Sequence, residues 1–559
     1  MRHDLEQAIS SAVQTLFGIE VPIELTRPDK TFGDYATSVA LKVATELGHK
    51  PRQVAETLSA QLGRDLADFV SQIVVAGPGF INIFLSDKAL LKLGLSKPSQ
   101  VYEGQQILVE FGDPNPLKAM HLGHLYTTIV GDTIARLLEA AGASVKRLSY
   151  HGDVGLHVAK AVWGIGETID WNPARLKELE SEEIEHDGLK LTLKTIIGYL
   201  YAKGARAFEE ESTAADRIKD INKHIYEQDD PTINAIYDWG VERSFKYFDL
   251  IFTELGVHFD KRYLESQSSP VGLRFVQRHL GSVFEKSQGA IVYKGEKKGL
   301  HTRVFVNSAG LPTYEAKDLG LAEMKKSDFK AADKSIIITA NEQVEYFRVM
   351  LAALSEFDAQ LAAKSQHLTH GFISLATGKM SSRTGLVYGA QELLDETHKT
   401  VSQNYPNSKV ASAVYLAAIK YTFLKYRLGG DIVFDVQQSV ALEGNSGPYL
   451  QYAHARARSI LAKASTPLAK PNDLMSEERS LALKISEYSE VVDRSVQELL
   501  PHHICIYLYE LAQEFNHFYE HNRVIGDGRE ASRLSLVKSY ADTLKQGLEL
   551  LGIPSPEQM

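Results

Sequence analysis

Two histidines three residues apart, His121 and His124, are the first candidates for chemistry, and Gly123 lies between them. At this spacing both imidazoles share one face of a first helical turn, where unpaired backbone N–H groups favour an anion. Gly123 leaves room for a flat ring or a phosphate to approach the backbone. The pair could therefore stabilise charge that develops on a transferred phosphoryl group. Exposed histidines at a helix start, or two metal ligands, are the alternatives for so short a motif.

The residues around the pair predict a β-α-β unit. An apolar run at 107–111 is typical of a buried parallel strand, and the prolines in the loop 112–116 prevent helix there. An amphipathic helix then ends at Gly142, and a second strand-like run follows at 144–150. Such a unit implies a parallel sheet, whose ligands bind at the carboxyl ends of its strands.

A second candidate stretch, 378–385, lies far along the chain and contains Lys379. It follows an apolar run at 371–375 and precedes a helical pattern that begins at Gln391. The stretch is small, cationic and bracketed by glycines, as a mobile loop that closes over phosphates would be.

Together the two stretches resemble the paired signature of class I aminoacyl-tRNA synthetases. Segment 113–125, which reads DPNPLKAMHLGHL, is similar to the HIGH region of the arginyl-tRNA synthetases. The resemblance covers nearly the whole chain, because stretches similar to the same family occur at 76–82, 311–318, 447–456 and 550–559.

The resemblance implies ATP-dependent activation of L-arginine to arginyl-adenylate, and then transfer to the 3'-terminal ribose of tRNA(Arg). ATP with Mg²⁺ would be a substrate, and no protein-bound structural metal is expected. Members of this family activate arginine only when tRNA is present. The implied partners are therefore tRNA(Arg), L-arginine and ATP.

The resemblance also implies the residues that bind ATP, with one departure from the class I pattern. Ser382 stands where the usual loop has a lysine that steadies the pyrophosphate. Family members without that lysine carry one just before the HIGH motif, a position that Lys118 occupies, and Arg383 is a further candidate. The implied catalytic residues are His121, His124, Lys118 and Lys379. The implied ATP contacts are Gly123, His121, His124, Lys379, Met380, Ser381, Ser382 and Arg383.

An arginine side chain calls for acidic groups, because a guanidinium is planar, always charged and best bound by carboxylates. Glu110 ends the first strand, and a glutamate inside an apolar run is uncommon unless it is paired. Asp318 and Tyr314 lie four residues apart and share a helix face. The family resemblance implies that arginine is bound by Glu110, Asn115, His124, Tyr314, Asp318 and Gln343.

Length and pattern predict a multidomain α/β protein, since 559 residues correspond to about three or four domains. We expect a small α+β N-terminal domain over residues 1–100, which the resemblance implies contacts tRNA, although a plain packing module is the alternative. A Rossmann-like parallel-sheet catalytic domain is expected over 101–408, with an inserted helical and hairpin segment at about 161–310. Residues 409–559 are expected to form an all-helical anticodon-binding bundle.

Composition sets further bounds. The net charge of −10 argues mildly against nucleic acid, so RNA binding would need local basic faces. The single cysteine, Cys505, excludes an intramolecular disulfide and a zinc site built on several thiolates. No apolar run is long enough to span a bilayer, and the first residues lack a secretory signal. We therefore expect a cytoplasmic protein that does not bind a membrane. We also expect a monomer.

Aromatic and histidine side chains near the end of the chain have two possible roles each. Phe515, Phe518 and Tyr519 could stack on bases, but their helical spacing favours core packing for most of them. His517 and His521 could bind a metal, but no third ligand is evident.

Several other functions compete with this interpretation. The fingerprints of dehydrogenases and P-loop ATPases are absent, since no G-x-G-x-x-G follows the first strand and Gly378 lacks the upstream glycine of a Walker loop. Another HIGH-type nucleotidyltransferase or a different class I synthetase remains possible, as does a non-catalytic tRNA-binding relative.

Overall fold

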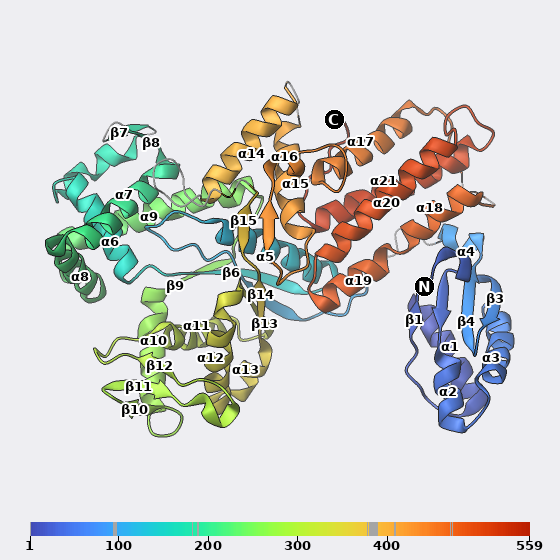
Figure 1. The fold of residues 1–559 in the computed structure, drawn as a ribbon, viewed down its shortest axis with the longest axis horizontal. Coiled ribbons are helices and arrows are strands. Elements are labelled where there is room, and N and C mark those ends of the chain that lie inside the picture. The colour runs from blue at the N-terminus through green and yellow to red at the C-terminus, as the bar shows by residue number, and fades with distance from the viewer. Residues whose placement is uncertain are drawn as a thin grey trace.

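The computed structural model describes residues 2–92, 98–181, 183–186, 189–376, 378, 389–406, 410–469, 471 and 473–559. Within these ranges it has an N-terminal unit, a central parallel sheet with an inserted helical unit, and a C-terminal helical bundle (Figure 1). No helix of the described residues is both long and apolar enough to cross a membrane.

The N-terminal unit is a small antiparallel sheet with helices packed on it. Its strands follow the order β1-β2-β4-β3. They are β1 (Leu25–Thr26), β2 (Tyr35–Thr37), β3 (Val70–Ala76) and β4 (Phe80–Leu85). The helices are α1 (Arg2–Phe17), α2 (Val39–Leu47), α3 (Pro51–Asp65) and α4 (Asp87–Lys92). The expected α+β character of this unit is confirmed.

The central sheet has five parallel strands in the order β14-β13-β5-β6-β9. They are β5 (Gln106–Glu110), β6 (Ser144–His151), β9 (Lys261–Leu264), β13 (Ala332–Ala340) and β14 (Ser365–His370). The chain builds outwards from β5 to β6 and β9, and then returns to the other side of β5 for β13 and β14. The strand order therefore reverses between β5 and β13, which is where ligands bind in open α/β sheets.

Helices connect these strands and cover the sheet. Helix α5 (Leu122–Ala140) joins β5 to β6, as the β-α-β pattern predicted. It packs so closely on the sheet that a Cβ at Gly131 would come within 2.1 Å of the Phe111 ring. The other covering helices are α10 (Glu265–Arg278), α11 (Tyr314–Asp328), α12 (Val344–Phe357) and α13 (Ala359–Lys364).

The segment expected as an insertion contains two kinds of structure. Helices α6 to α9 pack around an apolar core of their own. Their bounds, with those of a small hairpin, are α6 (Leu156–Thr168), β7 (Ile184–His186), β8 (Leu189–Leu191), α7 (Leu193–Glu210), α8 (Ser212–Glu227) and α9 (Pro231–Glu254). Strand β9, however, pairs with β6 and is part of the main sheet. Its sequence KRYL is short and charged, as an edge strand can be, so it lacks the apolar run of the other strands.

The predicted hairpin that follows is confirmed, and it has one strand more than expected. Strands β11 (Ala290–Tyr293) and β12 (Arg303–Val306) pair antiparallel, and β10 (Glu285–Ser287) pairs with β11 on the other side.

The C-terminal part is helical, with one exception. Its helices are α14 (Ala390–Asn404), α15 (Ala411–Leu424), α16 (Val436–Ser439), α17 (Gly447–Lys463), α18 (Ser476–Ser486), α19 (Tyr488–Glu498), α20 (His502–His521) and α21 (Glu530–Leu550). The expectation of helix throughout this part is wrong at β16 (Ile432–Phe434), which pairs in parallel with β15 (Ile373–Leu375). Three residues are too few for a strand period to be recognised in the sequence.

The aromatic residues of α20 belong mainly to the core. Phe515 and Phe518 are fully buried, and Phe515 stacks on Tyr540 with ring centroids 3.9 Å apart. Their burial leaves neither ring free to stack on a base, so the base-stacking alternative is wrong for Phe515 and Phe518. Tyr519 is half-buried, beneath the guanidinium of Arg456.

The N-terminal unit docks on the bundle through ion pairs (Figure 1). Arg479 of α18 donates to both carboxylate oxygens of the buried Asp34, at 2.7 and 3.1 Å. Arg27 contacts Glu490 of α19 at 2.6 Å. A single apolar core runs from the N-terminal unit through α5 into the bundle, so the three parts are joined by packing as well as by charge.

Candidate active site

The loop between β5 and α5 begins at the point where the strand order reverses, because Glu110 at the end of β5 pairs with Ile337 of β13. Two of its residues have a left-handed backbone, Asp113 (φ 46°) and Leu117 (φ 61°). The loop is held in this shape from outside. The Asp113 carboxylate accepts a hydrogen bond from the Tyr150 backbone N–H at 2.7 Å, and the Leu117 N–H donates to the Ser244 hydroxyl at 2.8 Å.

The histidine pair begins α5, as the sequence predicted. His121 is the N-cap residue, and its Nδ1 accepts from the backbone N–H of His124 at 3.3 Å. In return, Nδ1 of His124 accepts from the backbone N–H of His121 at 3.4 Å. The two rings stack, with centroids 3.5 Å apart. Because Nδ1 is the acceptor in both rings, each neutral imidazole carries its proton on Nε2. The cap therefore leaves two N–H donors side by side at a helix start.

The electrostatics of the pair keep both rings neutral. Desolvation by the surrounding protein and then the charge of Lys118 together lower the pKa of His121 to about 4, although part of the residue reaches solvent. The pKa of His124 is lowered well below its usual value, first by desolvation and then by His121 and Lys118. Lys118 thus lies close enough to act on both imidazoles. Its ammonium is 5.7 Å from the centre of the Tyr201 ring on α7.

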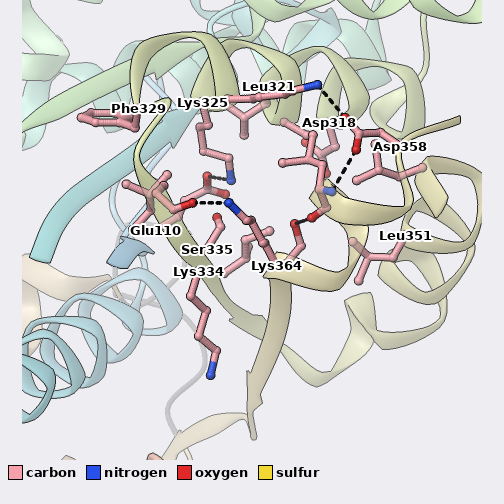
Figure 2. A pocket seen from close by; sticks show the side chains of 18 of the residues that line it. Glu110, Asp318, Leu321, Lys325, Phe329, Lys334, Ser335, Leu351, Asp358 and Lys364 are labelled. Carbon is pink, nitrogen blue, oxygen red and sulfur yellow. Dashed lines mark hydrogen bonds and ion pairs between the residues drawn. The ribbon is translucent and has the colours of Figure 1, made fainter. Parts of the chain in front are cut away.

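Glu110, one of the expected arginine ligands, already has a cationic partner. It is buried, and its carboxylate accepts from the Lys325 ammonium of α11 at 2.8 Å (Figure 2). Both side chains are almost inaccessible to solvent, so this is a buried ion pair. The partner explains why a glutamate stands in an apolar strand without any ligand being needed.

Asp318 is a half-buried acidic group that forms no ion pair with another described residue. It accepts a hydrogen bond from the Tyr346 hydroxyl. The pKa of Asp318 is raised to about 8, first by burial and then by the charges of Glu110 and Glu265. The hydrogen bond from Tyr346 and the charge of Lys325 oppose this rise. A carboxyl of this kind is ready for a cation, since a guanidinium would stabilise its ionised form.

The remaining expected arginine ligands surround the same edge without being joined to one another. The Asn115 side-chain oxygen accepts from the Gly152 N–H at 2.9 Å. Tyr314 is 63% exposed, and the Lys317 ammonium lies 5.2 Å from the centre of its ring. Gln343 is exposed at the end of β13, where the strand turns into α12.

The end of β6 and helices α10 and α11 contribute residues to which the sequence assigned no role. His151 is fully buried, and its Nδ1–H donates to the Pro114 carbonyl at 2.6 Å, which links β6 to the loop before the histidine pair. Its Nε2 accepts from Ser149 at 2.9 Å. Lys317 and Glu265 form a second buried ion pair at 2.7 Å. For His151 the sequence signal was the Gly-rich segment HGDVG at 151–155.

Five of the expected ATP-binding residues lie outside the described residues: Lys379, Met380, Ser381, Ser382 and Arg383. Within the described part of the chain, no three His, Cys, Asp or Glu side chains gather in a way that could hold a metal ion.

The fold and this edge of the sheet define a class I tRNA synthetase catalytic domain. The family model described as "tRNA synthetases class I (R), catalytic domain" matches residues 87–436. The arginyl tRNA synthetase N-terminal domain matches residues 1–85, and the DALR anticodon binding domain matches 450–559. The chain belongs to the arginyl-tRNA synthetase family.

Relatives along the whole chain agree with this. An arginine–tRNA ligase of Alcanivorax borkumensis is 31% identical, with all of both chains covered. One of Synechococcus is 30% identical and covers all of this chain and 99% of its own. The solved structure of Thermus thermophilus arginyl-tRNA synthetase has a TM-score of 0.83 and 26% identity, again over all of both chains.

Proposed function

We propose that the chain activates L-arginine with ATP and transfers the arginyl group to the 3'-terminal ribose of tRNA(Arg). One observation carries this proposal. The half-buried Asp318, which forms no ion pair with another described residue, lies at the same sheet edge as two neutral histidines that present Nε2–H donors. The first suits a guanidinium and the second suit a phosphate.

In the first step, a carboxylate oxygen of arginine attacks the α-phosphorus of ATP, and the bond to pyrophosphate breaks as the new P–O bond forms. His121 and His124 donate from Nε2 to the phosphate oxygens on which charge grows. Because their pKa values are lowered, they act as neutral donors and not as acids. Lys118 supplies the positive charge that the usual class I lysine would give at the position of Ser382.

In the second step, a ribose hydroxyl of the tRNA attacks the carbonyl carbon of arginyl-adenylate, and AMP leaves. In this proposal the substrate is the complex of ATP with Mg²⁺. The further ATP contacts proposed are Gly123, Lys379, Met380, Ser381, Ser382 and Arg383. The proposed arginine ligands are Asp318, Asn115, Tyr314, Gln343, His124 and Glu110, the last only if Lys325 shares its carboxylate.

We also propose that the units 1–100 and 409–559 contact the tRNA. The enzyme is proposed to be a cytoplasmic monomer. Light scattering tests the monomer, because one chain has a mass of 62.1 kDa. A mass of twice this value at working concentration would contradict it.

Arginine-dependent ATP–pyrophosphate exchange, with and without tRNA(Arg), tests the activity. We expect exchange only when arginine and tRNA are both present. Exchange driven by another amino acid would favour a different class I synthetase. Folded protein that binds tRNA but shows no exchange would favour a non-catalytic relative.

A further inference from the structure

A cavity of about 240 Å³ lies between the central sheet and helices α11, α12 and α13 (Figure 2). One end reaches Glu110 and Asp318, behind the proposed arginine site. Much of its wall is apolar and comes from the sheet and from the helices: Leu108, Leu321, Ile337, Phe347, Met350 and Leu354. Most of these side chains are buried, so an apolar group in the cavity would be shielded from water.

Two ammonium groups point into the middle of this apolar space, those of Lys325 and Lys364 (Figure 2). Lys325 donates to Glu110 at 2.8 Å, and Lys364 donates to the Ala332 carbonyl at 2.7 Å. An ammonium carries three N–H donors, so each has donors beyond the bond described. Glu110 balances Lys325, whereas Lys364 is solvent-exposed and its partner is a neutral carbonyl. The lining has more lysines than carboxylates, so it carries an excess of positive charge: Lys325, Lys326, Lys330, Lys334 and Lys364 against Glu110, Asp318 and Asp358.

A third polar group in the cavity wall has no partner at all among the described residues. Ser335 of β13 is 7% exposed, and its hydroxyl oxygen is buried without a hydrogen bond. Leaving such a group unsatisfied costs about 1–3 kcal/mol, so buried hydroxyls usually bond to something. A water molecule would satisfy Ser335, but it would not balance Lys364 or fill the apolar wall.

We propose that this cavity is a second binding site, for a small amphipathic anion with a carboxylate head and a short apolar body. The head accepts from Lys364 and Ser335, and the body lies against Leu321, Met350 and the neighbouring apolar side chains. The cavity is smaller than the roughly 300–1,000 Å³ of sites for drug-sized ligands, which limits the length of the body. Arginine is a poor occupant, because the lysines in the middle repel its guanidinium.

Calorimetric titration of the full chain with sodium octanoate tests the proposal, with inorganic phosphate titrated separately as a head without a body. We expect saturable binding of one octanoate per chain and much weaker binding of phosphate. Ser335→Ala and Lys364→Gln should each weaken octanoate binding about tenfold, the scale of one lost charge-assisted hydrogen bond. Lys334→Gln is the matched control, because Lys334 also lines the cavity but its ammonium points away from the middle in Figure 2.

Three results would overturn the site. They are no saturable binding of octanoate by the unaltered chain, phosphate binding as tight as that of octanoate, and unchanged or equal affinities in all three variants. Ser335→Ala keeps the test valid if Lys364→Gln does not fold. It removes an unsatisfied hydroxyl, so its melting temperature should be no lower than that of the unaltered chain.

Discussion

The proposed role of Asp318 as an arginine ligand predicts that the affinity for arginine depends on pH. The Asp318 pKa of about 8 means that only about one-tenth of the molecules hold it ionised at pH 7, and about nine-tenths at pH 9. A guanidinium binds the ionised form. The KM for arginine should therefore fall about tenfold between pH 7 and pH 9 and change little above pH 9. The assay is arginine-dependent pyrophosphate exchange with saturating tRNA and ATP.

Two variants separate this cause from any other pH effect. Asp318→Asn should raise the KM at pH 9 by about 30-fold or more, the scale of losing one partner of a buried charge pair, and should abolish the pH dependence. Tyr346→Phe removes the hydrogen bond that lowers the pKa of Asp318, so the fall in KM should move to higher pH. A KM that is flat from pH 7 to 9 in the unaltered chain, or equally steep in Asp318→Asn, would refute the reasoning.

Other perturbations test the histidines and the lysine near them. Substituting His124 or Lys118 by Ala should lower pyrophosphate exchange by about 10²–10³ with little change in melting temperature; normal turnover by a folded variant would remove that residue from the mechanism. His121→Ala removes the cap of α5 and should lower the free energy of unfolding in urea by about 1 kcal/mol. His121→Asn can still cap α5, so it should keep this stability. It lacks Nε2–H, so it should still lose exchange. His151 has a pKa of about 4 when folded against 6.5 when unfolded, so the folded state binds fewer protons and loses stability as the pH falls below 6.5. Its share of the loss between pH 7 and pH 5 is about 2 kcal/mol, and His151→Gln should unfold with a correspondingly shallower pH dependence.

Local features of the fold were predictable because they depend on neighbouring residues. The sequence predicts a strand at 107–111, a loop at the prolines that follow and a helix that ends near Gly142. Helix α5 begins within one residue of His121, as expected. Strand β9 was missed because an edge strand needs no apolar run, and β16 because three residues show no period.

Pairing across the chain was not predictable in the same way. Glu110 could be recognised as unusual, but its partner Lys325 is 215 residues away and looks like any lysine near a helix end. The bond from Tyr346 to Asp318 likewise joins two helices that only the fold brings together. The reciprocal histidine cap lay within four residues, yet the choice of Nδ1 as acceptor depends on side-chain geometry that spacing does not reveal.

The strand order has a consequence for folding during synthesis on the ribosome. β5 emerges early, but its neighbour on one side is β13, with Ile107 beside Lys334 and Glu110 beside Ile337. Until β13 has been synthesised, one whole edge of β5 has no strand to pair with, and Glu110 lacks its lysine. Nascent chains that stop within helices α6 to α9 would therefore expose an apolar strand edge, a template for aggregation and a target for proteases. Translation must pass β13 before the proposed arginine site can form.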